Sequence, residues 1–125
     1  MTQRLLKALE NPYVRILGHP TGRQMLRRDP FNFDAEAVFA AARRHGVILE
    51  VNASPERLDL CDRHVKLAHD RGMKVIISTD AHAPAHLAFM RYGVATARRG
   101  WMERDGVLNT LPPEQLLASL RPLPK

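Results

Sequence analysis

Val47-Ile48-Leu49-Glu50-Val51-Asn52-Ala53-Ser54 decides the fold, because a short β-branched apolar run changes into polar residues within this stretch. Two runs of similar character flank it, Val14-Arg15-Ile16-Leu17 earlier in the chain and Val75-Ile76-Ile77 later. Short, nearly continuous apolar runs are typical of parallel strands covered on both faces. We therefore expect three parallel strands, at Tyr13–Leu17, Val47–Val51 and Lys74–Ser78.

Helical segments alternate with these runs. They are expected at Thr2–Leu9, Asp34–His45, Ser54–Arg71, Pro84–Tyr92, Val94–Trp101 and Pro113–Leu120. Asp34, Ser54 and Thr110 are the expected N-caps, and Gly46 and Gly72 the expected stops. Strand and helix in alternation predict βαβ units and an α/β fold. Three strands are few for a barrel or a doubly wound sheet, so we expect residues 1–125 to be part of a larger domain with an unpaired strand edge.

Composition excludes some classes of site and leaves others open. The single cysteine, Cys61, excludes an internal disulfide framework and an all-cysteine zinc site within one chain. The chain carries a net charge of +6, and 15 of its 19 basic residues are arginine. Guanidinium groups suit a phosphate-bearing partner, although coding bias explains the same composition about equally well. No apolar run is long enough for a membrane span and no signal peptide is recognisable, so we expect a cytoplasmic protein.

Polar residues follow each expected strand. The three clusters are Gly18-His19-Pro20-Thr21-Gly22-Arg23, Glu50-Val51-Asn52-Ala53-Ser54 and Ser78-Thr79-Asp80-Ala81-His82. In parallel α/β folds the loops after the strands converge at one edge of the sheet and form the active site there. The three clusters therefore predict a functional site at the carboxyl edge of the sheet.

The pair Asp80-x-His82 is the sharpest signal within these clusters. Residues two apart in an extended segment face the same side, and a carboxylate with an imidazole suits zinc, manganese or iron. The alternative is an ordinary turn in which Asp80 binds backbone amides and His82 is a surface residue; the strand context favours ligands. His19 is a weaker candidate ligand, and Arg23 is placed to hold a phosphate.

Other polar residues have simpler explanations. Surface or supporting roles suit four histidines: His45, His64, His69 and His86. Glu50 faces either the core or the site, and Cys61 is expected to pack inward from a helix. Arg98 and Arg99 either follow a nucleic-acid backbone or form a solvated helix face.

The three clusters resemble, in order, the later motifs of the PHP (polymerase and histidinol phosphatase) superfamily. The tail is more specific. Its segments Gly93-Val94-Ala95-Thr96-Ala97-Arg98-Arg99-Gly100-Trp101 and Leu108-Asn109-Thr110-Leu111-Pro112 resemble the end of the PHP domain in bacterial family X DNA polymerases. The resemblance covers nearly the whole chain.

This resemblance implies a portion of a distorted seven-stranded β/α barrel with a trinuclear manganese or zinc cluster at its mouth. It also implies 3′-to-5′ exonuclease activity on DNA and a role in DNA repair. By match of motif, His19, Asp80 and His82 would be metal ligands, with Asp80 also catalytic. Arg23 would also be catalytic by neutralising a phosphate, and Asn52 would lie near the substrate; Arg98 and Arg99 are further candidates for substrate binding.

The family's His-x-His motif and the further ligands before His19 are absent from this sequence. We therefore expect little or no hydrolysis by this chain alone, and a companion chain that supplies the missing half. Two alternatives stay open: a small-molecule phosphatase of the histidinol phosphatase type, and a non-catalytic, DNA-associating remnant.

Overall fold

A computed structural model describes residues 1–124 and contains one three-stranded parallel sheet in the order β1-β2-β3. The strands are β1 (Ile16–Leu17), β2 (Ile48–Asn52) and β3 (Val75–Ser78). Ile16 is in register with Ile48, and Leu49 with Val75. The α/β class and the three parallel strands are thus confirmed, although β1 is shorter than the apolar run predicts.

Five α-helices accompany the sheet in the described part of the chain. They are α1 (Thr2–Glu10), α2 (Ala35–His45), α3 (Asp62–Asp70), α4 (Met90–Arg99) and α5 (Pro113–Ser119). Short 3-10 turns lie at η1 (Pro84–Phe89), η2 (Arg104–Gly106) and η3 (Leu108–Thr110). Asp34 caps α2 as expected, accepting a hydrogen bond from the Ala37 N–H at 3.0 Å, and Gly46 ends that helix in the left-handed region.

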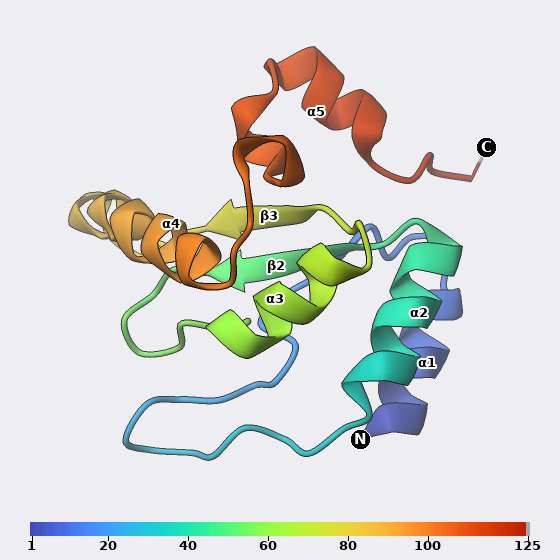
Figure 1. Cartoon of the computed structure of the whole chain (residues 1–125), viewed down its shortest axis with the longest axis horizontal. Coiled ribbons are helices and arrows are strands. Elements are labelled where there is room, and N and C mark those ends of the chain that lie inside the picture. The colour runs from blue at the N-terminus through green and yellow to red at the C-terminus, as the bar shows by residue number, and fades with distance from the viewer. Residues whose placement is uncertain (125) are drawn as a thin grey trace.

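Figure 1 shows how these elements are arranged around the sheet. The arrows of β2 and β3 point toward α4, while α1 and α2 lie side by side near the opposite end of the strands. α4 contacts both β2 and β3 and also packs on α3. The carboxyl edge of the sheet, where the polar clusters follow the strands, therefore lies beside α4.

The hydrophobic core covers one face of the sheet. Leu49 and Val51 of β2 and Val75 and Ile77 of β3 are buried, whereas the residues that alternate with them are only half-buried, except Asn52 at the end of β2, which is buried. Ile16 of β1 is 38% exposed on that second face. The expectation that the strands are covered on both faces is therefore wrong for the described residues, since their burial alternates along the strands.

The helix expected over Ser54–Arg71 is wrong in its first half, because residues 54–60 fold back on β2. The Asn52 N–H donates to the Asp59 carbonyl at 2.6 Å, and the Asp59 N–H donates to the Asn52 carbonyl at 3.2 Å. The Ser54 N–H donates to Asn52 Oδ1, and Ser54 is not an N-cap because no α-helix begins directly after it. α3 begins only at Asp62, and the half-buried Cys61 occupies its N-cap position.

The C-terminal elements differ in detail from the expected ones. Two helices were expected, at Pro84–Tyr92 and Val94–Trp101. The structure has the 3-10 turn η1 at residues 84–89, followed by one helix, α4. Thr110 does not cap α5, because its hydroxyl donates to the carbonyls of Arg104 and Val107; the N-cap position is Pro112. Among the described residues, no helix has the length and apolar character needed to span a membrane.

Candidate metal and phosphate site

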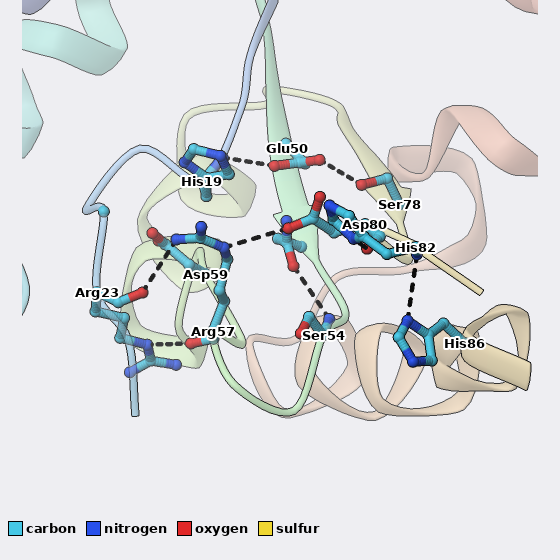
Figure 2. Close-up of polar contacts among 12 residues, drawn as sticks. His19, Arg23, Glu50, Ser54, Arg57, Asp59, Ser78, Asp80, His82 and His86 are labelled. Carbon is cyan, nitrogen blue, oxygen red and sulfur yellow. Dashed lines mark hydrogen bonds and ion pairs between the residues drawn. The ribbon is translucent and has the colours of Figure 1, made fainter. Parts of the chain in front are cut away.

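Glu50 links the carboxyl ends of β1 and β3, as Figure 2 shows. Its Oε2 accepts a hydrogen bond from the backbone N–H of His19, with 2.5 Å between nitrogen and oxygen. Its Oε1 accepts a hydrogen bond from the Ser78 hydroxyl. The half-buried carboxylate on the central strand therefore faces the site edge rather than the core, which answers the question that the sequence left open.

Asp80 holds the ring of His82 in one tautomer. Nδ1 of His82 lies 2.6 Å from the backbone carbonyl oxygen of Asp80. A carbonyl oxygen only accepts hydrogen bonds, so Nδ1 carries the proton and Nε2 of the neutral ring keeps a free lone pair. Metal-binding histidines are commonly oriented in this way. The exposed His82 ring therefore has the tautomer that a metal ligand needs.

His86, four residues after His82, hydrogen-bonds to the His82 backbone. Its Nδ1 accepts a hydrogen bond from the His82 backbone N–H at 3.2 Å, and its ring stacks on Phe89 with 4.8 Å between centroids. Because Nδ1 accepts, the neutral His86 ring carries its proton on Nε2 and has no free lone pair. This geometry fits a supporting role better than ligation.

Asp80 forms an ion pair with Arg57, a residue that the sequence analysis did not single out. Nε of Arg57 lies 3.2 Å from Oδ2 of Asp80, and both side chains are half-buried. Partial burial opposes ionisation of Asp80. The Asn52 amide and the Arg57 guanidinium outweigh it, so the pKa of Asp80 lies below its ordinary value. Asp80 therefore presents a carboxylate at neutral pH.

Asn52 contributes a buried donor that has no hydrogen-bond partner within residues 1–124. The residue is 1% exposed, and its Oδ1 accepts from the Ser54 N–H, which fixes the orientation of the amide. Its Nδ2 lies close enough to Asp80 to lower the pKa of that carboxyl, but makes no hydrogen bond of ordinary geometry. A buried donor left unpaired costs about 1–3 kcal/mol, and the group that Nδ2 is placed to stabilise is the Asp80 carboxylate beside it.

Arg23 has partners other than a free phosphate position. Its Nε donates to the carbonyl of Arg57 at 2.5 Å, and its Nη2 donates to the carbonyl of Leu58. Arg23 therefore braces the segment that carries Arg57, and Arg57 is the guanidinium beside Asp80 (Figure 2). Sequence spacing gives no signal for Arg57, because the fold-back of residues 54–60 brings it to the site.

The residues around Asp80 and His82 line a cleft of about 480 Å³. Its lining is Ser54, Pro55, Glu56, Arg57, Asp80, His82, His86 and Phe89. His19 and Arg23 are not part of this lining, and neither are Arg98 and Arg99 at the end of α4. Arg99 pairs with Asp62 at 3.0 Å instead. The structure therefore brings together Asp80 and His82, but not the whole predicted set.

His19 and Asp80 both adopt positive backbone φ angles, of 28° and 51°. Residues other than glycine rarely occupy this region, and such positions cluster at functional sites. His19 and Asp80 each lie two residues after the end of an outer strand of the sheet, β1 and β3, and Glu50 of the central strand accepts a hydrogen bond from the His19 N–H.

The donors present fit part of a metal site. Asp80 and His82 supply a carboxylate and an imidazole, which suit zinc or manganese. Within residues 1–124, however, no three His, Cys, Asp or Glu side chains gather closely enough to hold an ion. Any ion held by Asp80 and His82 would need further ligands.

Sequence comparison supports a PHP-type phosphoesterase, and the chain fits a fragment of the PHP domain. The chain is 43% identical over 107 residues to the DNA polymerase/3′-5′ exonuclease PolX of Bacillus subtilis (strain 168). This alignment covers 86% of the chain and 19% of that protein. The resemblance to bacterial family X DNA polymerases is thereby confirmed.

Probable phosphatases are also similar to this chain. Those of Thermoanaerobacter sp. (strain X514) and Shewanella sediminis (strain HAW-EB3) are each 29% identical, over 87% and 95% of the chain. The chain spans 44% and 48% of these relatives. No protein-family model matches the chain.

Proposed function

We propose that this chain is part of a metal-dependent phosphoesterase domain that removes nucleotides from the 3′ end of DNA during repair. The observation that carries the proposal is the pairing of Asp80 with His82, in which a carboxylate and a correctly protonated imidazole share one cleft. The similarity to a DNA polymerase/3′-5′ exonuclease at 43% identity supports DNA as the substrate.

Asp80 and His82 would hold a manganese or zinc ion, with His19 as a further ligand from the loop after β1. When bound, such an ion lowers the pKa of its water and polarises a phosphate oxygen. The chain's own residues orient the donors. The Asp80 carbonyl fixes the His82 tautomer, and His86 fixes the backbone at His82.

Arg57 would bind the substrate phosphate, and Asn52 would support the site from behind Asp80. The Arg57 guanidinium lines the cleft beside Asp80, and a guanidinium fork matches phosphate oxygens bidentately. Asn52 lies outside the cleft lining, and its buried Nδ2 would act on the substrate through the Asp80 carboxylate beside it. Arg23 would act through Arg57 by bracing its backbone. Arg98 and Arg99 would meet the DNA backbone farther from the cleft.

Additional residues from outside this chain would complete the β/α barrel and the donor set. The relatives are about twice to five times as long as the segment that matches this chain. The half-buried face of β2 and β3 also carries Glu50 and Ser78, which point to the site edge. A companion segment packing on this face would bury its isoleucines and bring further ligands toward Asp80.

A chimera tests the proposal directly. Residues of this chain replace the matching 107 residues of the Bacillus subtilis protein, and release of nucleotides from 3′-labelled DNA is measured with manganese present. The chimera should degrade DNA, and Asp80→Ala and His82→Ala should each abolish that activity. His69→Ala on α3 is the matched control and should leave it unchanged.

Two outcomes of this assay would reject the proposal. A chimera that hydrolyses a small phosphomonoester but not DNA would favour a small-molecule phosphatase. A correctly folded chimera that binds DNA without hydrolysing it, and that is indifferent to Asp80→Ala, would favour the DNA-associating remnant.

A further inference from the structure

The loop between β1 and α2 contains a tight turn, Gln24–Arg28, and Leu26 at its tip is the most exposed of the large apolar side chains in residues 1–124. Leu26 has a relative exposure of 105%. The backbone N–H and carbonyl of Gln24 pair with those of Arg28 at 2.9 and 2.8 Å, forming an antiparallel bridge that closes the turn. The tip is therefore presented by a hydrogen-bonded turn.

Leu26 is unfavourable for stability in two respects. Its φ of 62° lies in the left-handed region, which glycine or asparagine adopts far more readily than leucine. Its side chain also buries no apolar surface, so it gains nothing from the hydrophobic effect. A strained and fully exposed leucine points to a role outside the folding of this chain.

The base of the turn is fixed to the wall of the candidate cleft. The Met25 N–H donates to the Glu56 carbonyl at 2.6 Å, and Arg23 Nε donates to the Arg57 carbonyl. Glu56 and Arg57 line the cleft that contains Asp80. The turn is therefore anchored directly beside the place where a phosphodiester would be cleaved.

The rest of the loop is also held in place. Arg28 donates to the Gly22 carbonyl through Nε at 2.9 Å and Nη2 at 2.6 Å, and lies over the Phe31 ring. Phe31 packs against Gly22 so closely that a Cβ there would clash with the ring. These contacts hold Arg28 within the loop, whereas Arg27 is exposed beside Leu26.

We propose that the Gln24–Arg28 turn engages the strand of nucleic acid whose end lies in the cleft, with Leu26 against a base and Arg27 on a phosphate. This inference rests on the proposed function. Charge complementarity favours this occupant, because the chain carries a net charge of +6 and the loop contains three arginines, Arg23, Arg27 and Arg28. Apolar wedges, leucine included, that contact unstacked bases are a known mode of nucleic-acid binding.

The test measures binding of the full chain to a fluorescent single-stranded DNA oligonucleotide, with chelator present so that metal chemistry does not contribute. Leu26→Gly should weaken binding about fivefold. The same variant should raise the urea midpoint of unfolding, because glycine relieves the positive φ. Leu26→Trp should tighten binding, since an indole stacks on a base more strongly than leucine does. If Leu26 served only to stabilise the fold, Leu26→Gly would not weaken DNA binding while raising the urea midpoint.

Arg27→Gln should lower the dependence of log affinity on log salt by about one unit. Arg44→Gln, at the end of α2, is the control with the same change in net charge. It should weaken DNA binding only by the general effect of losing one positive charge. Equal DNA affinity for Leu26→Gly and the unchanged chain would overturn the proposal. So would binding to anionic lipid vesicles without binding to DNA. Because hydrolysis is not measured, either failure is distinct from an inactive chimera.

Discussion

The side-chain amide of Asn109 pairs with both backbone groups of Ile77, as a neighbouring strand would. Its Oδ1 accepts from the Ile77 N–H at 2.7 Å, and its Nδ2 donates to the Ile77 carbonyl at 2.9 Å. Together with the Val75–Val107 bridge, this contact occupies the outer edge of β3. One of the two outer edges of the sheet is thus partly closed by a side chain.

Asn109→Ala should destabilise the fold by about 1–3 kcal/mol, because it leaves two part-buried backbone groups of Ile77 without partners. Urea unfolding followed by circular dichroism measures the loss. Gln115→Ala on the exposed surface of α5 is the control and should change little. Equal midpoints for the two variants would show that the amide contact does not hold the edge.

Gly93→Ala should destabilise by about 1–3 kcal/mol through overpacking. Gly93 is buried in α4, and a Cβ there would lie 2.8 Å from the Ala53 Cβ and still closer to Cγ2 of Ile77. Ala95→Ser, on the exposed side of the same helix, is the matched control. Thermal unfolding of both variants is the measurement, and a Gly93→Ala protein as stable as the control would mean that α4 does not pack closely on the sheet.

Asp59→Asn should remove a pH dependence of stability. Asp59 is fully buried, and burial raises its pKa although hydrogen bonds from Thr21 and the charge of Arg23 offset part of the effect. The folded chain therefore binds this proton more tightly than the unfolded chain. Stability falls as pH rises from the unfolded pKa, near 3.9, through the folded one.

The urea midpoint of Asp59→Asn minus that of the unchanged chain should therefore be more positive at about pH 7 than at about pH 4. The asparagine Oδ1 still accepts from the Thr21 N–H, which limits other effects. A difference that stays the same at both pH values would contradict the assigned titration.

Cys61 should react with iodoacetamide at a lower pH than an ordinary thiol. Burial raises the pKa of Cys61. His64, whose Nδ1 lies 3.6 Å from Sγ, has the larger effect in the opposite direction, so the pKa falls to about 7. The alkylation rate should therefore have its midpoint near that value, and His64→Gln should move it toward about 8.5. Intact mass counts one adduct, because the chain has one cysteine, and Cys61→Ser gives the blank. A midpoint unaffected by His64→Gln would contradict the pairing.

The elements with strong local signals were predictable from sequence. The Asp34 cap and the Gly46 stop fixed α2, and β-branched runs fixed β2 and β3. The start of α3 was not predictable, because Ser54-Pro55 is a good local cap signal. The long-range bridge between Asn52 and Asp59 overrides that signal.

The candidate site divides in the same way. Asp80 and His82 follow a recognisable strand, so their shared cleft was predictable, although their roles remain predictions. Arg57 was missed because only the fold-back of its segment brings it to Asp80. From its sequence position, Arg23 was expected to bind a phosphate. In the structure its guanidinium donates to the carbonyls of Arg57 and Leu58.

The central claim is that Asp80 and His82 are metal ligands, and metal content tests it most directly. Elemental analysis of the purified chimera, loaded with manganese or zinc and then desalted, is compared with that of its His82→Ala and Asp80→Ala variants and of the His69→Ala control. We predict that each ligand variant retains less metal per protein than the unchanged chimera, while the control retains all of it. Full metal content in a folded His82→Ala or Asp80→Ala variant would contradict the claim.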